Sequence, residues 1–495
     1  MVSRSNPGVG RYLIGNVVVV FMALLVNQIV QTAGAAILTH IVANPARYGE
    51  INVLLQILGL VGIFLSLGLN SALTYALATG RPERDDAFWL TLWVSLGFGV
   101  VLAGSLALSA GIIAALYRIP ALEPAIVIMG LILVVNSLAN ILTAVLSGQK
   151  LFRRQALAMV LPVFASTVGM VIGAAVSLRS HHLLLWVALG QVAGTVAGVV
   201  TIGVLSRPYL PRLFRPDWSY LRTLLRYGLP MWAGNIFKSF QQPFLVITMG
   251  LVSFSAAGFL TNSLKIIGFI ANITWAFNIV VLPWLSEVQH QPELIRMRAT
   301  LAFRYNNYLI YPLSVVTIME RHWISVTVFG PQYAHTAAYL LPATIAIGLS
   351  SVSRLGGTLL AGIGQPRGNF WPMVASGLVT LIATPLLLLK AGPVAAVYPY
   401  LWGWVLATAL TIAFALKDGL WLDYGDAFGW PMVPSAAMVA SYGLAKALGL
   451  GPLGALLLAL AVLATVTGAI EQRGRWGARH IQRLKRHVPF HPPWA

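Results

Sequence analysis

Two lysines lie inside apolar segments that are long enough to cross a lipid bilayer. Lys238 lies within residues 229–251 and Lys265 within residues 254–284. A lysine at the centre of a membrane helix costs about 3 kcal/mol on insertion scales and usually faces a water-filled cavity and a charged partner. No Asp or Glu lies in the middle of any apolar segment, so the lysines predict an anionic ligand in a cavity within the membrane. The alternative is that they snorkel or contact backbone carbonyls.

Amide side chains recur at helical spacing beside these lysines. Asn235, Lys238 and Gln242 share one helix face, and Thr261, Asn262, Lys265 and Asn272 share another. Amides pair with hydroxyl groups and ammonium groups pair with phosphate oxygens, so the pattern predicts a sugar-phosphate ligand. The alternative is that polar stripes only join helices. The predicted substrate-binding residues are Asn27, Gln31, Gln56, Asn70, Asn235, Lys238, Gln242, Asn262, Lys265, Asn272 and Arg354.

Arg354 differs from the two lysines in its depth. It lies toward the cytoplasmic end of the segment near 335–362, where it would either snorkel to the surface or contact the ligand. Enzyme signatures are missing. The chain has neither a G-x-x-x-x-G-K-[ST] loop nor H-E-x-x-H, and it has no cysteine. We therefore expect no catalytic residue, no metal and no cofactor.

The elements that must position these residues are membrane helices. The chain is 58% hydrophobic and only 9% charged, whereas soluble domains are about 25% charged. Apolar runs predict an all-α polytopic membrane protein with fourteen spans. The runs lie near 13–39, 52–78, 88–115, 122–147, 157–178, 183–205, 229–251, 254–284, 305–328, 335–362, 370–390, 394–416, 430–449 and 452–470.

The basic residues predict the orientation. With fourteen spans and the N-terminus inside, 23 of the 32 Lys and Arg residues fall in cytoplasmic segments and six in the opposite loops. This asymmetry follows the positive-inside rule and predicts a multi-pass protein with both termini cytoplasmic. The net charge of +19 therefore reflects topology, and we expect no nucleic-acid partner.

Two landmarks suggest an internal duplication. Arg11-Tyr12 and Arg226-Tyr227 precede the first and seventh spans, and Gly148-Gln149 and Gly364-Gln365 end the fourth and tenth. Two six-helix halves of one orientation are typical of transporters that rock about a central site. The predicted units are a six-helix bundle (1–205), a basic cytoplasmic linker (206–228), a second bundle (229–417), two additional helices (418–471) and a basic cytoplasmic tail (472–495). The tail is predicted either to bind anionic lipid or to be solvated.

Several short motifs resemble one family in chain order. The run from Pro45 through Tyr48 and Gly49, followed by Leu67-Gly68-Leu69, is similar to the first loop and second span of the Wzx-type polysaccharide flippases. These belong to the multidrug/oligosaccharidyl-lipid/polysaccharide exporter (MOP) superfamily. The second half carries similar signatures, which are Tyr227–Pro230, Ala257–Phe259, Pro283 and the run from Phe329 to Leu341.

The resemblance implies two helical bundles around a V-shaped cavity with a cationic lining. It also implies flipping of a polyprenyl-diphosphate-linked oligosaccharide across the inner membrane, by alternating access, for exopolysaccharide, O-antigen or capsule assembly. The implied partners are this lipid-linked substrate, membrane lipids, and a polysaccharide polymerase with its export machinery. Peptidoglycan-lipid flippases of the superfamily carry cations in the first span. Here that span has only Arg11 at its mouth, which disfavours a peptidoglycan substrate.

Two other functions fit parts of the sequence. A drug or cation exporter of the same superfamily often uses carboxylates at membrane depth, which this chain lacks. A membrane polysaccharide polymerase or ligase would carry a large outer loop, and the predicted outer loops are short.

Overall fold

The computed structural model describes residues 7–474 apart from 66, 79–83, 181, 211–217, 219–220, 287–290, 363–364, 366, 418 and 420–421. This part of the chain is helical and contains no strand. The long helices are α1 (Pro7–Val42), α4 (Arg84–Tyr117), α5 (Leu122–Gly148), α6 (Phe152–Ser180), α7 (Leu183–Ser206), α8 (Leu221–Gly250), α9 (Phe254–Ser286), α10 (Pro292–Met319), α12 (Thr336–Gly362), α13 (Arg367–Ala391), α14 (Tyr398–Lys417), α15 (Trp430–Ala447) and α16 (Pro452–Gly474). Shorter ones are α2 (Pro45–Gly62), α3 (Leu69–Ala78) and α11 (Arg321–Phe329).

Every predicted apolar segment coincides with one helix or with two consecutive helices. Among the described residues, 10 helices are long and apolar enough to span a membrane. The all-α polytopic architecture is therefore confirmed, and the count of fourteen spans stays a prediction. The second segment is divided into α2 and α3, because Leu67 and Gly68 take positive φ angles of 43° and 75° that a helix does not continue through.

The ninth segment begins earlier than its hydropathy indicates. α10 starts at Pro292 and includes Arg298 and Arg304, which are only 2% and 1% exposed. The predicted topology places both arginines in a cytoplasmic segment, and the structure buries them there. Their burial has a local cause, since α10 packs against the π-helical turn Gly425–Gly429, where Asn307 donates a 2.9 Å hydrogen bond to the carbonyl of Ala427.

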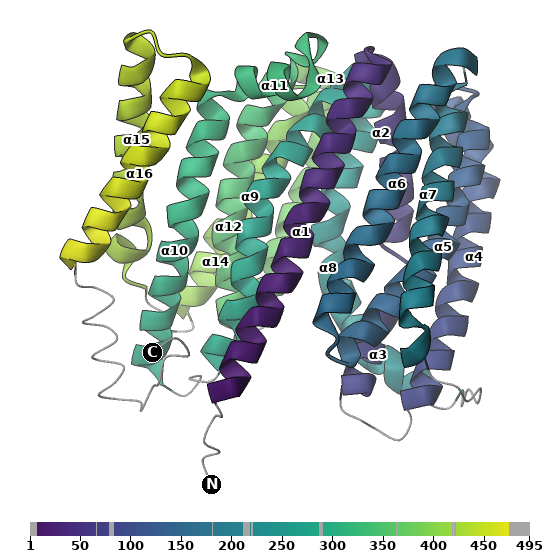
Figure 1. Cartoon of the computed structure of the whole chain (residues 1–495), viewed down its shortest axis with the longest axis horizontal. Coiled ribbons are helices and arrows are strands. Elements are labelled where there is room, and N and C mark those ends of the chain that lie inside the picture. The colour runs from purple at the N-terminus through teal and green to yellow at the C-terminus, as the bar shows by residue number, and fades with distance from the viewer. Residues whose placement is uncertain are drawn as a thin grey trace.

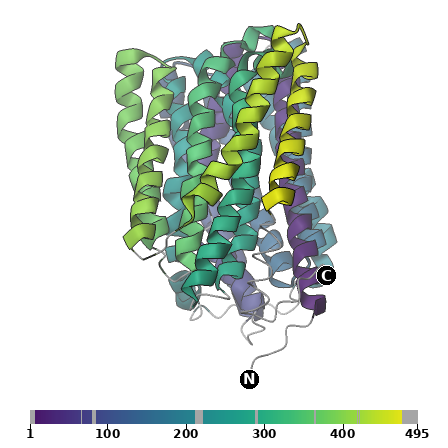
Figure 2. The same cartoon turned by 90° about the vertical axis from the view of Figure 1, so that its left-hand side faces the viewer.

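The helices form an elongated bundle with α15 and α16 at one side and α3 to α7 at the other (Figure 1). Seen from the side of α15 and α16, this pair stands in front of the remaining helices (Figure 2) and packs against α10. The two predicted halves, α1–α7 and α8–α14, meet mainly where α1, α2 and α3 contact α8 and α9. α1 packs on α9, α2 packs on α8 and α9, and α3 packs on α8.

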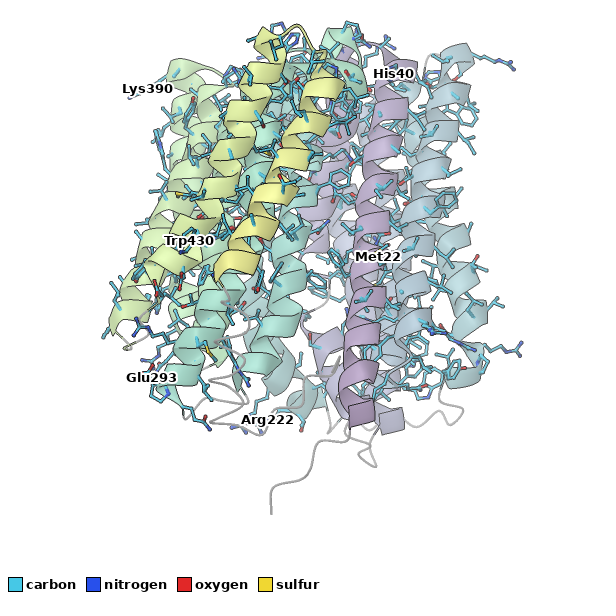
Figure 3. The ribbon with its side chains drawn as sticks, turned by 60° about the vertical axis from the view of Figure 1, so that its left-hand side comes forward. Met22, His40, Arg222, Glu293, Lys390 and Trp430 are labelled. Carbon is cyan, nitrogen blue, oxygen red and sulfur yellow. The ribbon has the colours of Figure 1, made fainter. Side chains whose placement is uncertain are left out.

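Labelled residues define the two ends of the bundle. His40 and Lys390 lie at one end, and Arg222 and Glu293 lie at the other (Figure 3). We call these the outer end and the inner end, after the predicted topology. The first helix begins and the last described helix ends toward the inner end (Figure 1), an arrangement that agrees with an even number of crossings.

Glycines allow α6 and α7 to pack closely against each other. A Cβ added at Gly169 of α6 would collide with the backbone carbonyl of Gly190 in α7, and Gly173 and Gly194 are equally crowded. Small residues at such crossings let membrane helices approach through van der Waals contact alone.

Candidate functional site

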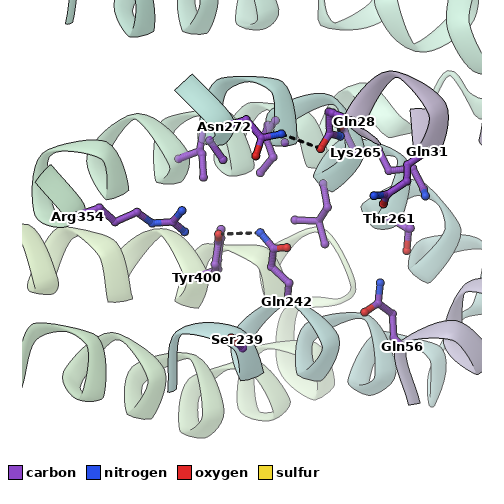
Figure 4. Close-up of a pocket in the computed structure, with 15 residues that line it drawn as sticks. Gln28, Gln31, Gln56, Ser239, Gln242, Thr261, Lys265, Asn272, Arg354 and Tyr400 are labelled. Atoms are coloured by element: carbon purple, nitrogen blue, oxygen red, sulfur yellow. Dashed lines mark hydrogen bonds between the residues drawn. The ribbon is translucent and has the colours of Figure 1, made fainter. Parts of the chain in front are cut away.

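A polar cavity lies where α1, α2, α8, α9, α12 and α14 come together. Its volume is about 370 Å³, within the range of small-molecule sites. The polar lining comes from six helices: Gln28 and Gln31 of α1, Gln56 of α2, Ser239 and Gln242 of α8, Thr261, Lys265 and Asn272 of α9, Arg354 of α12 and Tyr400 of α14 (Figure 4). Residues far apart in sequence therefore face one space.

Six of the predicted binding residues line this cavity. They are Gln31, Gln56, Gln242, Lys265, Asn272 and Arg354. Asn235 and Lys238 lie in α8, two turns and one turn before Gln242 respectively, but their side chains are outside the described part of the chain. The assignment of Lys238 to the ligand therefore stays a prediction.

Three predicted residues are not among the cavity lining. The amide nitrogen of Asn27 donates a 3.2 Å hydrogen bond to the carbonyl of Met159, which joins α1 to α6. Asn262 is fully buried and accepts from Tyr48 across the contact of α2 with α9. Asn70 lies in α3, beside the turn where Thr74 packs on α5. Helix joining, the alternative reading of the polar stripes, fits Asn27 and Asn262.

Arg354 points into the cavity and away from the inner end. α12 and α14 run in the same direction, because Leu349 bonds with Thr408 and Ser353 with Thr411. The guanidinium carbon of Arg354 nevertheless lies 5.0 Å above the ring of Trp404, which precedes Thr411 by seven residues, or roughly 10 Å along the helix. Long side chains on a helix lean toward its N-terminus, so here Arg354 reaches back toward the membrane centre.

Aromatic side chains of α14 support this arginine. Trp404 is 1% exposed and meets Tyr400 edge to face, with ring centroids 6.3 Å apart. Gln242 of α8 donates a 3.3 Å hydrogen bond to the Tyr400 hydroxyl. A guanidinium held over an indole ring keeps its fork of N–H donors free for a ligand, and the Nε of Arg354 is buried without a hydrogen-bond partner.

The charge of the described lining is positive. Lys265 and Arg354 are its only charged side chains, and amides and hydroxyls make up the rest of its polar surface. Such a lining can bind an anion that also carries hydroxyl or amide groups. A cationic ligand would find no carboxylate among these residues.

Sequence reasoning missed Gln28, Ser239 and Tyr400. Gln28 lies one turn before Gln31, and residues three apart share a helix face. The spacing could therefore have predicted Gln28 as a lining residue. Ser239 and Tyr400 have no such pattern. Tyr400 lies near the start of α14, which begins at Tyr398. A single aromatic residue in an apolar segment does not indicate which other helices it contacts.

The cavity is closed toward the outer end by a contact of α2 with α9. Tyr48 is 1% exposed, and its hydroxyl donates a 2.7 Å hydrogen bond to the side-chain oxygen of Asn262. The ring of Tyr333 meets Tyr48 edge to face at 5.5 Å. A Cβ added at Gly49 would collide with the backbone carbonyl of Phe254, so the two helices touch through their backbones here.

A second contact closes the same end between α4 and α8. The hydroxyl of Tyr117 donates a 2.8 Å hydrogen bond to the carbonyl of Ile247. Gly250 leaves room beside it, since an added Cβ would lie 3.2 Å from the Tyr117 ring. Gln332 adds a bond of 3.5 Å to the carbonyl of Thr39 at the outer end of α1.

Three of the six motifs that carry the family resemblance meet at this outer closure. Pro45, Tyr48 and Gly49 face Gly258 of the Ala257–Phe259 motif, and Tyr333 of the run from Phe329 to Leu341 packs against Tyr48 and Phe259. Leu67–Leu69 lies instead at the break between α2 and α3. The side chains of residues 227–230 and of Pro283 are outside the described part. The resemblance thus rests more on the closure than on the cavity.

Comparison with known proteins agrees with this geometry. Residues 37–338, more than half of the chain, match the family described as polysaccharide biosynthesis protein. The chain belongs to this family. The resemblance to polysaccharide flippases seen in the motifs is thereby confirmed at the level of the family. Among curated proteins, none matches the sequence significantly.

Solved structures with the same fold belong to membrane transporters. The lipid II flippase MurJ in an inward closed conformation superposes with a TM-score of 0.75 and 13% identity, covering 93% of this chain and 99% of MurJ. An inward-facing MATE multidrug transporter of the MOP superfamily gives 0.60 and 14%, covering 81% and 99%. A MOP transporter from Pyrococcus furiosus gives 0.54 and 14%, covering 85% and 96%.

The chain therefore belongs to the polysaccharide biosynthesis protein family and has the fold of membrane transporters of the MOP superfamily. What remains to be assigned is the molecule that the cavity binds.

Proposed function

We propose that this member of the polysaccharide biosynthesis protein family is a lipid-linked oligosaccharide flippase. It moves a polyprenyl-diphosphate-linked repeat unit from the cytoplasmic to the periplasmic leaflet of the inner membrane, for exopolysaccharide, O-antigen or capsule assembly. Both termini are cytoplasmic in this proposal. A polysaccharide polymerase and export machinery use the flipped unit.

The observation that carries the proposal is the make-up of the cavity. Lys265 and Arg354 are its only charged side chains among the described residues, and the amides of glutamine and asparagine supply most of its other polar groups. A diphosphate offers only acceptors to the two cations, whereas sugar hydroxyls both donate to and accept from amides. The fold shared with a lipid II flippase supports a lipid-linked saccharide over a free one.

Each side chain then has a role. Lys265 and Arg354 hold the diphosphate or an acidic sugar, together with Lys238 as predicted from the sequence. Gln31, Gln56, Gln242 and Asn272 contact hydroxyls, with Asn235 beside them on α8. Asn27 and Asn262 join helices, and Asn70 stays outside the site. The prenyl tail remains in lipid next to the two added helices, α15 and α16.

Translocation by alternating access uses the two predicted halves, residues 1–205 and 229–417, as its moving parts. The outer contacts between α2 and α9 and between α4 and α8 lie across these halves, so they must separate to release ligand outward. The hydrogen bonds and the backbone contacts at glycines can break together and form again together, as expected of a transporter that alternates between two states.

A drug exporter of the same superfamily is the second candidate, because the fold also matches MATE multidrug transporters. The positive lining disfavours it for cationic drugs, since no described lining carboxylate could bind them. An anionic drug would still fit the charge.

Deletion of the gene separates these functions. We expect cells without the protein to accumulate complete lipid-linked repeat units in the cytoplasmic leaflet and to lack surface polymer, with normal drug sensitivity. Leaflet location can be measured by access of an added periplasmic glycosidase to the lipid-linked units in spheroplasts. Unpolymerised units exposed on the periplasmic face, or normal polymer with raised drug sensitivity, would each refute the proposal.

A further inference from the structure

Gln28 joins α1 to α9 inside the cavity through both ends of its amide. Its nitrogen donates a 2.7 Å hydrogen bond to the backbone carbonyl of Lys265. Its oxygen accepts a 3.2 Å hydrogen bond from the amide nitrogen of Asn272. Because a backbone carbonyl can only accept, the first bond fixes which end of the amide is nitrogen, and the second bond agrees with it.

The surface of α9 is shaped for this amide. A Cβ added at Gly268 would lie 2.6 Å from the nitrogen and 2.7 Å from the oxygen of Gln28. Lys265, Gly268 and Asn272 follow at i, i+3 and i+7, which places all three on one helix face. Gln28 therefore fits into a notch between two polar groups, and only glycine leaves that notch open.

The same amide faces the ligand space. Gln28, Lys265, Gly268 and Asn272 all line the cavity, and Figure 4 shows Gln28 beside Lys265 with its bond to Asn272. An amide has two N–H donors and an oxygen with two lone pairs. Each of these bonds is therefore open to competition from a ligand that reaches this wall.

We propose that Gln28 is a latch between α1 and α9 that a saccharide group releases. The proposal rests on the flippase function and adds to it a residue that senses the sugar. A sugar hydroxyl or acetamido group can donate to the oxygen of Gln28 and accept from Asn272. It thereby replaces the hydrogen bond between Asn272 and Gln28. A diphosphate has only acceptors at neutral pH, so it cannot satisfy the oxygen of Gln28.

The position of the latch gives its release a consequence. Gln28 is in the first predicted half and α9 is in the second, and Asn262 of the outer closure lies one turn from Lys265 on α9. Separation of α1 and α2 from α9 at the outer end requires the hydrogen bonds of Gln28 to Lys265 and Asn272 to lengthen or break. The latch therefore holds the outer closure until a saccharide occupies the cavity, and a lipid diphosphate without sugar leaves it closed.

The test uses the full chain, which contains no cysteine and so gives no background thiol reaction. A reporter pair, Thr39→Cys with Gln332→Cys, lies where α1 meets the outer loop and crosslinks with a short thiol reagent while the outer end is closed. In nanodiscs we add polyprenyl diphosphate, or the same lipid carrying one N-acetylhexosamine. Gln28→Leu removes the bonds, and Gly268→Ala fills the notch while keeping the glutamine.

Controls match each change. Gly97→Ala adds a methyl group where no atom lies within 4 Å, and Ile29→Leu alters the residue after Gln28, which is 55% exposed. We expect the glycosylated lipid to lower crosslinking in the reporter protein and in both controls, and the sugar-free lipid to leave it unchanged. Gln28→Leu and Gly268→Ala should lower crosslinking without any lipid, by about tenfold for the loss of two hydrogen bonds.

The outcomes separate the latch from the flippase function. Equal opening by both lipids, or unchanged crosslinking in Gln28→Leu and Gly268→Ala, would refute the latch and leave the flippase function standing. If neither lipid binds the nanodisc protein nor changes its crosslinking, the flippase function is refuted, and the latch with it.

Discussion

The hydroxyl of Tyr48 donates a 2.7 Å hydrogen bond to the side-chain oxygen of Asn262, across the contact that closes the cavity. Both residues are at most 1% exposed. A buried acceptor that loses its donor costs about 1–3 kcal/mol. This one bond is therefore strong enough to bias which end of the transporter is open.

We predict that Tyr48→Phe shifts the protein toward an outward-open state, because Asn262 loses its donor only in the closed form. A bias of about 1–3 kcal/mol corresponds to a population change of about 5- to 150-fold. Labelling of an Ala257→Cys variant by a membrane-impermeant thiol reagent should increase. Unchanged labelling would show that this hydrogen bond does not contribute to closure.

Gly49→Ala should prevent closure more completely than Tyr48→Phe does. The added methyl group meets the carbonyl of Phe254, which cannot rotate away as a side chain would. We expect normal membrane insertion and loss of transport, with permanent outer labelling. Gly104→Ala is the matched control, since no atom lies within 4 Å of its added Cβ. Transport by Gly49→Ala at the control rate would contradict the backbone contact.

The hydropathy of the chain predicts its helices well because bilayer thickness fixes the length of an apolar run. It misses the break between α2 and α3, since the left-handed backbone at Leu67 is not a property of hydropathy. It also places the start of α10 too late, because Arg298 and Arg304 are buried against protein and not exposed to water.

For the site, helical spacing brought together Lys265 and Asn272 on α9 and Gln242 on α8. Spacing alone cannot tell a face that lines a cavity from a face that meets another helix. Asn262 shares the stripe of Lys265 and yet bonds to Tyr48. Gln28 and Tyr400 depend on how α1 crosses α9 and how α14 packs on α12, which are contacts between distant parts of the chain.

Lys446 and Glu320 form an ion pair of 2.6 Å that ties the outer end of α15 to the turn between α10 and α11. Glu320 is 4% exposed, so Lys446→Met leaves a buried carboxylate without its partner. We expect a lower melting temperature for this variant. The double variant Lys446→Met, Glu320→Gln should recover most of the loss. A double variant as unstable as the single one would show that α15 is held by other contacts.

The carboxyl of Asp426, before α15, predicts a pH dependence of stability. Burial, followed by the charge of Asp423, raises its pKa from the ordinary 3.8 to about 6. A group whose pKa is raised by folding contributes stability below its ordinary pKa, and this contribution is lost as pH rises through about 6. The melting temperature should therefore rise as pH falls from about 7 to about 5. Asp426→Asn should remove this part of the rise, and an identical pH profile would contradict it.

The central claim is that Lys265 and Arg354 bind the anionic part of a lipid-linked saccharide. The direct measurement is flipping of a fluorescent polyprenyl-diphosphate oligosaccharide in proteoliposomes, scored per correctly inserted molecule. We predict that Lys265→Gln with Arg354→Gln reduces flipping by at least about 100-fold, since each lost charge-assisted bond is worth about 1.5–3 kcal/mol. Lys265→Arg with Arg354→Lys should retain part of the activity, because both charges remain. Flipping by the double Gln variant at the rate of the unmodified protein would contradict the account.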